Sequence, residues 1–207
     1  MSFAEAERHL RAALAQRERA LLVIAGPNGA GKSTFYDTVL AALGLPFVNA
    51  DLIAATLAEG DPVRLARRAS SVADEERAAL LARGESFVTE TVFSDPAGAK
   101  IAMLREAQDR GYAVLLVFVG VASAGLGVLR VGQRVAAGGH PVPLARIEAR
   151  FPRTLANLRT ALGFVDVAWI FDNSSVEVPF RFVARWERGR RVRRSRLRPA
   201  WLPDDLR

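Results

Sequence analysis

The chain has 207 residues, of which 50% are hydrophobic and 25% charged, and it carries a formal net charge of +7. This length is enough for one compact domain with a substantial core. The absence of cysteine excludes disulfides, thiolate metal sites and cysteine nucleophiles. The N-terminus lacks the apolar core of a signal peptide, and no apolar run approaches the roughly 20 residues of a membrane span. We therefore expect a soluble, cytoplasmic protein without a membrane partner.

The expected elements alternate between helix and strand along most of the chain. A helix over 3–18 precedes a strand over 20–25, and a glycine-rich loop then leads into a helix over 33–43. Further strands are expected over 46–51, 86–93, 112–120 and 165–174, with helices over 61–82, 96–110, 123–137 and 144–161. This alternation predicts a three-layer α/β fold, with a mostly parallel five-stranded sheet, helices on both faces and a C-terminal β-hairpin.

The chain contains no linker or internal repeat, so we expect a single domain over residues 1–207. Its parts are an N-terminal helix over 1–19, a core over 20–175, and a basic hairpin and tail over 176–207. The arginine-rich stretch from Arg185 to Arg198 either contacts an anionic partner or is a solvated surface. We favour the solvated surface and do not expect nucleic acid as a partner.

The glycine-rich loop carries the most specific motif. Residues 26–34, GPNGAGKST, match G-x-x-x-x-G-K-[ST] between a strand and a helix. Glycines let the backbone bring its N–H groups close to phosphate oxygens, and the following helix directs its positive end at the same anion. Lys32 is suited to bridging the β- and γ-phosphates, and the Ser33 hydroxyl to ligating Mg²⁺. The predicted nucleotide-binding residues are Gly26, Pro27, Asn28, Gly29, Ala30, Gly31, Lys32, Ser33 and Thr34.

Two large classes of P-loop protein are excluded by missing motifs. An ABC-type ATPase needs a segment similar to LSGGQ and an apolar strand that ends in Asp-Glu, and the strand VLLVFVG ends in Gly120 without an acid. A GTPase needs Asn-Lys-x-Asp to bind guanine, and this segment is also missing.

Two carboxylates are expected at strand ends near the phosphates, Asp51 in NADLIA and Glu90 in FVTETVFS. Strand carboxyl ends line the ligand crevice of open α/β sheets, and a carboxylate can accept the proton of an acceptor hydroxyl. Asp51 has an alternative interpretation as the N-cap of the next helix, and Glu90 as a surface residue.

A third feature is the arginine-rich stretch over about 130–150. Arg130, Arg134, Arg146, Arg150 and Arg153 flank a Gly-Gly-His-Pro turn over 138–141 that includes His140. Arginines on a lid can neutralise charge that develops on the γ-phosphate. The alternative is that these helix faces are basic for solubility alone.

The segments GPNGAGKSTF, NADLIA, FVTETVFS, GYAVLLVFV, RVGQRVAAGGHPVP, IEARFPRTLANL and IFDNS occur in an order that resembles the zeta-toxin-like P-loop kinases, particularly the branch often labelled predicted ABC-type ATPase. The resemblance spans about residues 20–175. It implies a kinase-like P-loop fold and an ATP- and Mg²⁺-dependent enzyme that phosphorylates the 3′-hydroxyl of UDP-N-acetylglucosamine. It also implies a toxin that is restrained by an antitoxin protein.

The resemblance assigns roles to the two carboxylates and their neighbours. Asp51 would be the base that activates the sugar hydroxyl, and Glu90 and Thr91 would hold the acceptor. Lys32 and Ser33 would keep their roles toward ATP and Mg²⁺.

Arg134 and a second arginine would clamp the γ-phosphate. Arg150 fits the pattern of this branch, whereas Arg146 fits the spacing of the zeta toxins proper, and we favour Arg150. Asn173, at the end of the last predicted parallel strand, would contact the nucleotide base.

The acceptor stays open because the lid and the segment between Asp51 and Glu90 are shorter than in the toxins. The alternatives are a P-loop kinase for a nucleoside, a polynucleotide end or another metabolite, and a non-catalytic, nucleotide-gated binding protein.

Overall fold

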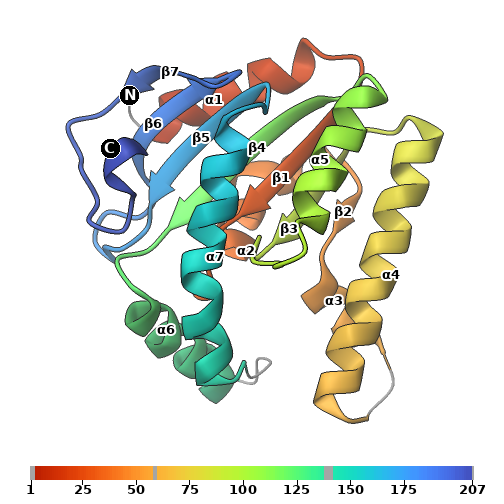
Figure 1. The fold of residues 1–207 in the computed structure, drawn as a ribbon, viewed down its shortest axis with the longest axis vertical. Coiled ribbons are helices and arrows are strands. Elements are labelled where there is room, and N and C mark those ends of the chain that lie inside the picture. Colours follow the sequence, from red (N-terminus) through yellow and green to blue (C-terminus); the bar gives the residue numbers. More distant parts are fainter. Residues whose placement is uncertain (1–2, 58–59, 138–141, 207) are drawn as a thin grey trace.

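The computed structural model describes residues 3–57, 60–137 and 142–206. Its framework is a seven-stranded sheet with the order β2-β3-β1-β4-β5-β6-β7 (Figure 1). Strands β1 to β5 are parallel, and β6 and β7 are antiparallel to their neighbours. The strands are β1 (Ala20–Ala25), β2 (Phe47–Val48), β3 (Phe87–Thr91), β4 (Ala113–Gly120), β5 (Val167–Asp172), β6 (Arg181–Glu187) and β7 (Arg190–Arg194).

The expected three layers are present. The helices are α1 (Phe3–Ala15), α2 (Lys32–Phe35), α3 (Ala50–Thr56), α4 (Pro62–Arg83), α5 (Ala99–Asp109), α6 (Ala124–Ala136) and α7 (Leu144–Leu162). Apolar residues of α4, α5 and α7 cover one face of the sheet, and those of α1 and the helical segment after the P-loop cover the other. In Figure 1, α5 and α7 cross in front of the strands and α1 lies behind them. Burial on both faces explains why β1 and β4 are continuous apolar runs.

The expected number of strands, five, is wrong. The C-terminal hairpin pairs with β5 and extends the same sheet: Ile170 lies opposite Ala184, and Ala184 lies opposite Arg194. The hairpin turns at Gly189, as expected, where a φ of 80° favours glycine.

The C-terminal segment is only partly a basic surface. All five residues of β7 are exposed. Trp201 and Leu202, in contrast, are buried in the core. The Trp201 indole lies so close to Gly120 that a Cβ atom there would be 2.2 Å from the ring. Its Nε1 donates a hydrogen bond to Oδ1 of buried Asp172 at 2.8 Å, so residues beyond the hairpin complete the core.

The expected strand over 46–51 is too long. Only Phe47 and Val48 form β2, because Asn49 begins a short helix, α3, that the sequence analysis missed. Oδ1 of Asn49 accepts hydrogen bonds from the backbone N–H groups of Asp51 and Leu52. Asp51 therefore lies in the first turn of α3, and neither the strand-end position nor the N-cap alternative is correct for it.

Other elements agree with expectation to within a few residues. The helical segment after the P-loop spans 32–43, but it changes from α2 to a π-helical turn over Tyr36–Leu40 and a 3-10 turn over Ala41–Leu43. No helix among residues 3–57, 60–137 and 142–206 combines the length and apolarity that a bilayer crossing requires.

Candidate functional site

The P-loop connects β1 to α2 at the carboxyl end of the parallel strands. Gly26, Gly29 and Gly31 have φ values of 151°, 73° and 89°, which residues with a Cβ atom rarely adopt. A Cβ atom on Gly26 would also lie 2.1 Å from the carbonyl oxygen of Val119. Both the loop conformation and its packing therefore require glycine at this position.

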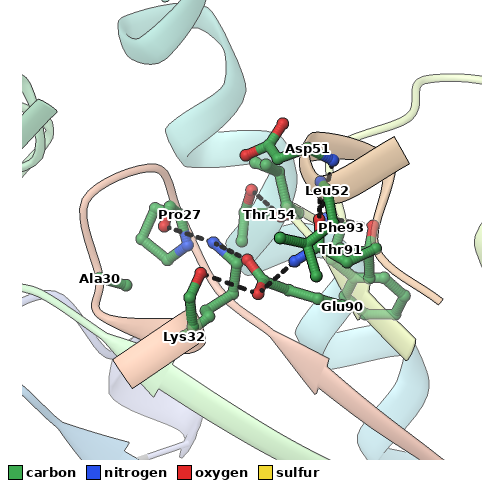
Figure 2. Close-up of polar contacts among 12 residues, drawn as sticks. Pro27, Ala30, Lys32, Asp51, Leu52, Glu90, Thr91, Phe93 and Thr154 are labelled. Carbon is green, nitrogen blue, oxygen red and sulfur yellow. Dashed lines mark hydrogen bonds and ion pairs between the residues drawn. The ribbon is translucent and has the colours of Figure 1, made fainter. Parts of the chain in front are cut away.

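Lys32 is the central cation of the site and is buried. Its Nζ donates a hydrogen bond to the carbonyl oxygen of Pro27 at 3.1 Å and lies 3.8 Å from Oε1 of Glu90 (Figure 2). Burial lowers the pKa of Lys32, whereas the charges of Glu90 and Asp51 raise it and those of Arg134 and Arg150 lower it further. The structure thus brings four other predicted residues within electrostatic range of Lys32.

Glu90, on β3, joins the P-loop to the neighbouring strand. Its Oε2 accepts hydrogen bonds from the Ser33 hydroxyl at 3.0 Å and from Nδ2 of Asn49 at 2.9 Å. Strand pairing places Glu90 opposite Ile24 of β1, directly before the loop. The Glu90 side chain is only 10% exposed. The alternative of a surface residue is therefore wrong, and Glu90 lies at the phosphate end of the site.

Asp51 and Thr91 lie beside this cluster. The Asp51 side chain is exposed on the first turn of α3. The Thr91 hydroxyl is half-buried and accepts a hydrogen bond from the backbone N–H of Phe93 at 3.0 Å. Thr91 thus stabilises the turn after β3.

The arginine-rich segment forms the end of α6 and the start of α7. Arg134 and Arg146 are exposed, and Arg150 is half-buried. Burial lowers the pKa of Arg150, as do Arg146 and Arg153, whereas the negative charge of Asp51 raises it. Arg134 and Arg150 both lower the pKa of Lys32 through their positive charges. The turn over 138–141, with His140, lies outside the described residues.

Helix α7 is anchored beside the strand that carries Glu90. The hydroxyl of buried Thr154 donates a hydrogen bond to the carbonyl oxygen of Val92 at 2.8 Å, and Nδ2 of Asn157 donates one to that of Phe93 at 3.0 Å. Thr154 lies one turn after Arg150. The position of Arg150 is therefore set relative to β3.

Asn173 lies against the P-loop, where its side chain is already engaged. Its Nδ2 donates a hydrogen bond to the carbonyl oxygen of Ala30 at 2.8 Å, and its Oδ1 accepts one from the backbone N–H of Phe180 at 3.2 Å. Arg130 of α6 donates to the backbone oxygen of Asn173 at 2.7 Å and lies 3.5 Å from that of Gly29. Asn173 and Arg130 therefore stabilise the P-loop through its backbone carbonyl oxygens.

Sequence analysis missed Asn49 as a site residue and missed the contact of Arg130 with the loop. The signal for Asn49 was its position two residues before Asp51, at the start of a helix, since asparagine is a preferred N-cap residue. No local signal marked Arg130, because its partners are 43 and 101 residues away in the chain.

Comparisons with known proteins identify the fold. A chain of the AvrRxo1-ORF1:AvrRxo1-ORF2 complex, solved with ATP, is 18% identical with a TM-score of 0.68 over 84% of this chain and 60% of that one. A chain of the PezAT chromosomal toxin-antitoxin system of Streptococcus pneumoniae is 15% identical with a TM-score of 0.60, over 82% and 76%. A chain of the Pnkp1/Rnl/Hen1 RNA repair complex is 19% identical with a TM-score of 0.50, over 70% and 46%.

At these identities the likeness establishes the fold alone, and the chain spans only 60% of the AvrRxo1 complex chain that it matches. No curated protein sequence matches the chain. The sequence profile of the AAA_33 family, described as an AAA domain, matches residues 21–152. The chain therefore belongs to the AAA_33 family and has a P-loop kinase-like fold, which supports nucleotide binding.

Proposed function

We propose that the protein is a phosphotransferase that moves the γ-phosphate of ATP to a hydroxyl group of a small molecule. The observation that carries this proposal is the cluster in which P-loop residues Lys32 and Ser33 meet Glu90, at 3.8 Å and 3.0 Å, beside the exposed carboxylate of Asp51. A nucleotide-gated switch needs the P-loop, but it does not need a carboxylate that faces an acceptor.

The oxygen atoms beside Lys32 fit a magnesium ion. Mg²⁺ prefers oxygen ligands, and the Ser33 hydroxyl and the Glu90 carboxylate lie 3.0 Å apart. Among the described residues there is no group of three or more acidic, histidine or cysteine side chains that could hold a metal ion, which agrees with an ion held mainly through nucleotide phosphates. Mg²⁺ would neutralise charge on the β- and γ-phosphates. We therefore propose that Glu90 helps to hold Mg²⁺, in addition to the acceptor-binding role that the resemblance implies.

Asp51 is the proposed general base. Its carboxylate would take the proton of the acceptor hydroxyl while the hydroxyl oxygen bonds to the γ-phosphorus atom. The bond from that phosphorus atom to the β–γ bridging oxygen then breaks and leaves ADP. Arg134 and Arg150 would offset the charge that develops on the transferred group, because preorganised cations in such a site stabilise the transition state. Their influence on Lys32 supports this placement.

We propose UDP-N-acetylglucosamine as the acceptor and an antitoxin protein as the partner. Both rest on the resemblance to zeta-toxin-like kinases, and the fold likeness to the PezAT toxin-antitoxin chain supports only the antitoxin partner. A nucleoside or polynucleotide end is the second candidate acceptor, which the likeness to the RNA repair complex chain favours.

The test is incubation of the protein with ATP, Mg²⁺ and UDP-N-acetylglucosamine, followed by mass spectrometry of the sugar nucleotide. Wild type should add one phosphoryl group, and Asp51→Asn should not. Asp109→Asn is the matched control, since Asp109 is exposed at the end of α5, outside the proposed site. An unmodified sugar with intact ATP binding would overturn this acceptor, and the assay would move to nucleosides and polynucleotide ends. Equal activity of Asp51→Asn and wild type would overturn the base.

A further inference from the structure

We propose that Asn49 is a positioning residue that holds the two carboxylates of the site, Glu90 and Asp51, in register with the P-loop. This inference rests on the proposed function and adds to it a residue that touches neither the nucleotide nor the acceptor. Asn49 lies between the end of β2 and the start of α3, and it is only 6% exposed.

Each end of the Asn49 amide bonds to a different carboxylate residue. Oδ1 accepts the backbone N–H of Asp51 at 2.8 Å, which orients the first turn of α3. Nδ2 donates to Oε2 of Glu90 at 2.9 Å, and the same oxygen accepts the Ser33 hydroxyl at 3.0 Å. The contacts form a continuous chain from the P-loop through Glu90 and Asn49 to the helix that carries Asp51.

The backbone around Asn49 is held in place independently. The carbonyl oxygen of Val48 accepts a hydrogen bond from the hydroxyl of buried Thr89 at 3.0 Å, and the N–H of Val88 donates to the carbonyl oxygen of Pro46 at 2.8 Å. Because these two contacts tie both ends of β2 to β3 directly before Asn49, the Asn49 side chain starts from a rigid position. It can therefore fix the position of Glu90 relative to the helical turn that carries Asp51.

The residue type itself supports a dual role. An N-cap alone needs only an acceptor, which Asn, Asp, Ser and Thr all supply. A residue that only binds a carboxylate needs only a donor. Among the preferred N-cap residues, asparagine has an amide that accepts through its oxygen and donates through its nitrogen at the same time. Aspartate at position 49 would keep the cap but would place a second carboxylate 2.9 Å or less from Glu90, where like charges repel.

The test uses Asn49→Ser, which keeps an N-cap oxygen and removes the amide nitrogen that donates to Glu90. Removal of such outer hydrogen bonds typically costs about 10- to 100-fold, and we expect kcat to fall by that factor. We also expect the gain in ATP affinity that Mg²⁺ gives over EDTA to shrink about tenfold, because Glu90 is no longer held against Ser33. ATP affinity in EDTA should be unchanged.

Asp61→Ser is the matched control, because Asp61 caps α4 through a hydrogen bond to the N–H of Arg64 and its substitution also exchanges one N-cap oxygen for another. Asp61→Ser should leave unchanged kcat, the gain in ATP affinity that Mg²⁺ gives, and the ATP affinity in EDTA. If Asn49→Ser does not fold, Asn49→Thr carries the same test. Wild-type values for kcat and for Mg²⁺-dependent binding would overturn the inference, and so would an equal loss of ATP affinity with and without Mg²⁺, which indicates a purely structural role. The binding arm needs no acceptor, so it remains informative if the proposed kinase reaction fails.

Discussion

Gly127 of α6 packs directly against Gly29 of the P-loop. A Cβ atom on Gly29 would lie 2.5 Å from the carbonyl oxygen of Gly127, and one on Gly127 would lie 2.6 Å from that of Asn28. With the contacts of Arg130, this close approach joins the base of the arginine-bearing helix to the phosphate-binding loop. The first half of α6 is therefore held rigidly against the P-loop.

Gly127→Ala should weaken ATP binding. Because the added methyl group would meet backbone, the loop or α6 must shift, and we expect a loss of about tenfold in affinity, or ~1.4 kcal/mol, by isothermal titration calorimetry. Gly132→Ala on the same helix is the control, since nothing lies within 4 Å of a Cβ atom there. The control should bind ATP normally and be more stable by about 0.5–1 kcal/mol. Unchanged ATP affinity in Gly127→Ala would contradict the proposed rigid connection.

Asn173→Ala should reduce the affinities for ATP and GTP by the same factor, about tenfold. Its amide supports the carbonyl oxygen of Ala30 and is already engaged with Phe180, so the loop and not the base is affected. Parallel titrations with ATP and GTP measure the ratio of the two affinities in the variant and in wild type. A variant that loses discrimination between the two bases would instead support the base contact that the resemblance implies.

Arg150→Ala should lower kcat by about 10³-fold, as for other arginines that stabilise transferred phosphoryl groups. Arg146→Ala should cost less than about tenfold, because Arg146 is exposed and Arg150 shares the surroundings of Lys32 and Asp51. Steady-state kinetics with both variants settle which arginine pairs with Arg134. The reverse order of effects would assign the role to Arg146.

The pKa of Lys32 makes stability depend on pH. Burial lowers this pKa below its ordinary value of 10.5. Between the lowered pKa and 10.5 the unfolded chain binds a proton that the folded chain has released, so stability should rise with pH in that window. Below the window the fold carries the whole cost of burying the ammonium group.

Lys32→Met should remove this contribution along with ATP binding. The stability difference between Lys32→Met and wild type should therefore favour the variant most below the lowered pKa and shrink as the pH approaches 10.5. Urea denaturation across that range without nucleotide measures it. A difference that does not vary with pH would show that Lys32 keeps its proton throughout.

Trp201→Phe should destabilise the protein by about 1–3 kcal/mol, the usual cost when a buried acceptor loses its donor. Asp172 is 1% exposed and would lose the indole N–H that lies 2.8 Å away. Denaturant unfolding measures the loss. Arg190→Gln on exposed β7 should stay within about 0.5 kcal/mol of wild type. If both variants unfold like wild type, the hydrogen bond from Trp201 to Asp172 does not stabilise the fold.

Much of the fold could be predicted because its signals are local. The apolar runs of β1 and β4 and the helix pattern over 144–161 depend on side chains a few residues apart, and the structure has these elements near the expected positions. Elements with weak local signals were less well predicted. Helix α3 has seven residues, too few for a clear periodic pattern, and the pairing of β6 with β5 depends on the register of two distant strands.

The phosphate-binding loop could be predicted from local sequence, because the glycines, Lys32 and Ser33 act within one short segment between a strand and a helix. The residues that surround this loop come together only in the folded chain. Ser33 meets Glu90 across 57 residues of chain, Glu90 meets Asn49 across 41, and Asn173 reaches Ala30 across 143. These residues meet because the parallel sheet places the carboxyl ends of β1, β2, β3 and β5 at one edge. No local sequence pattern specifies this order of strands.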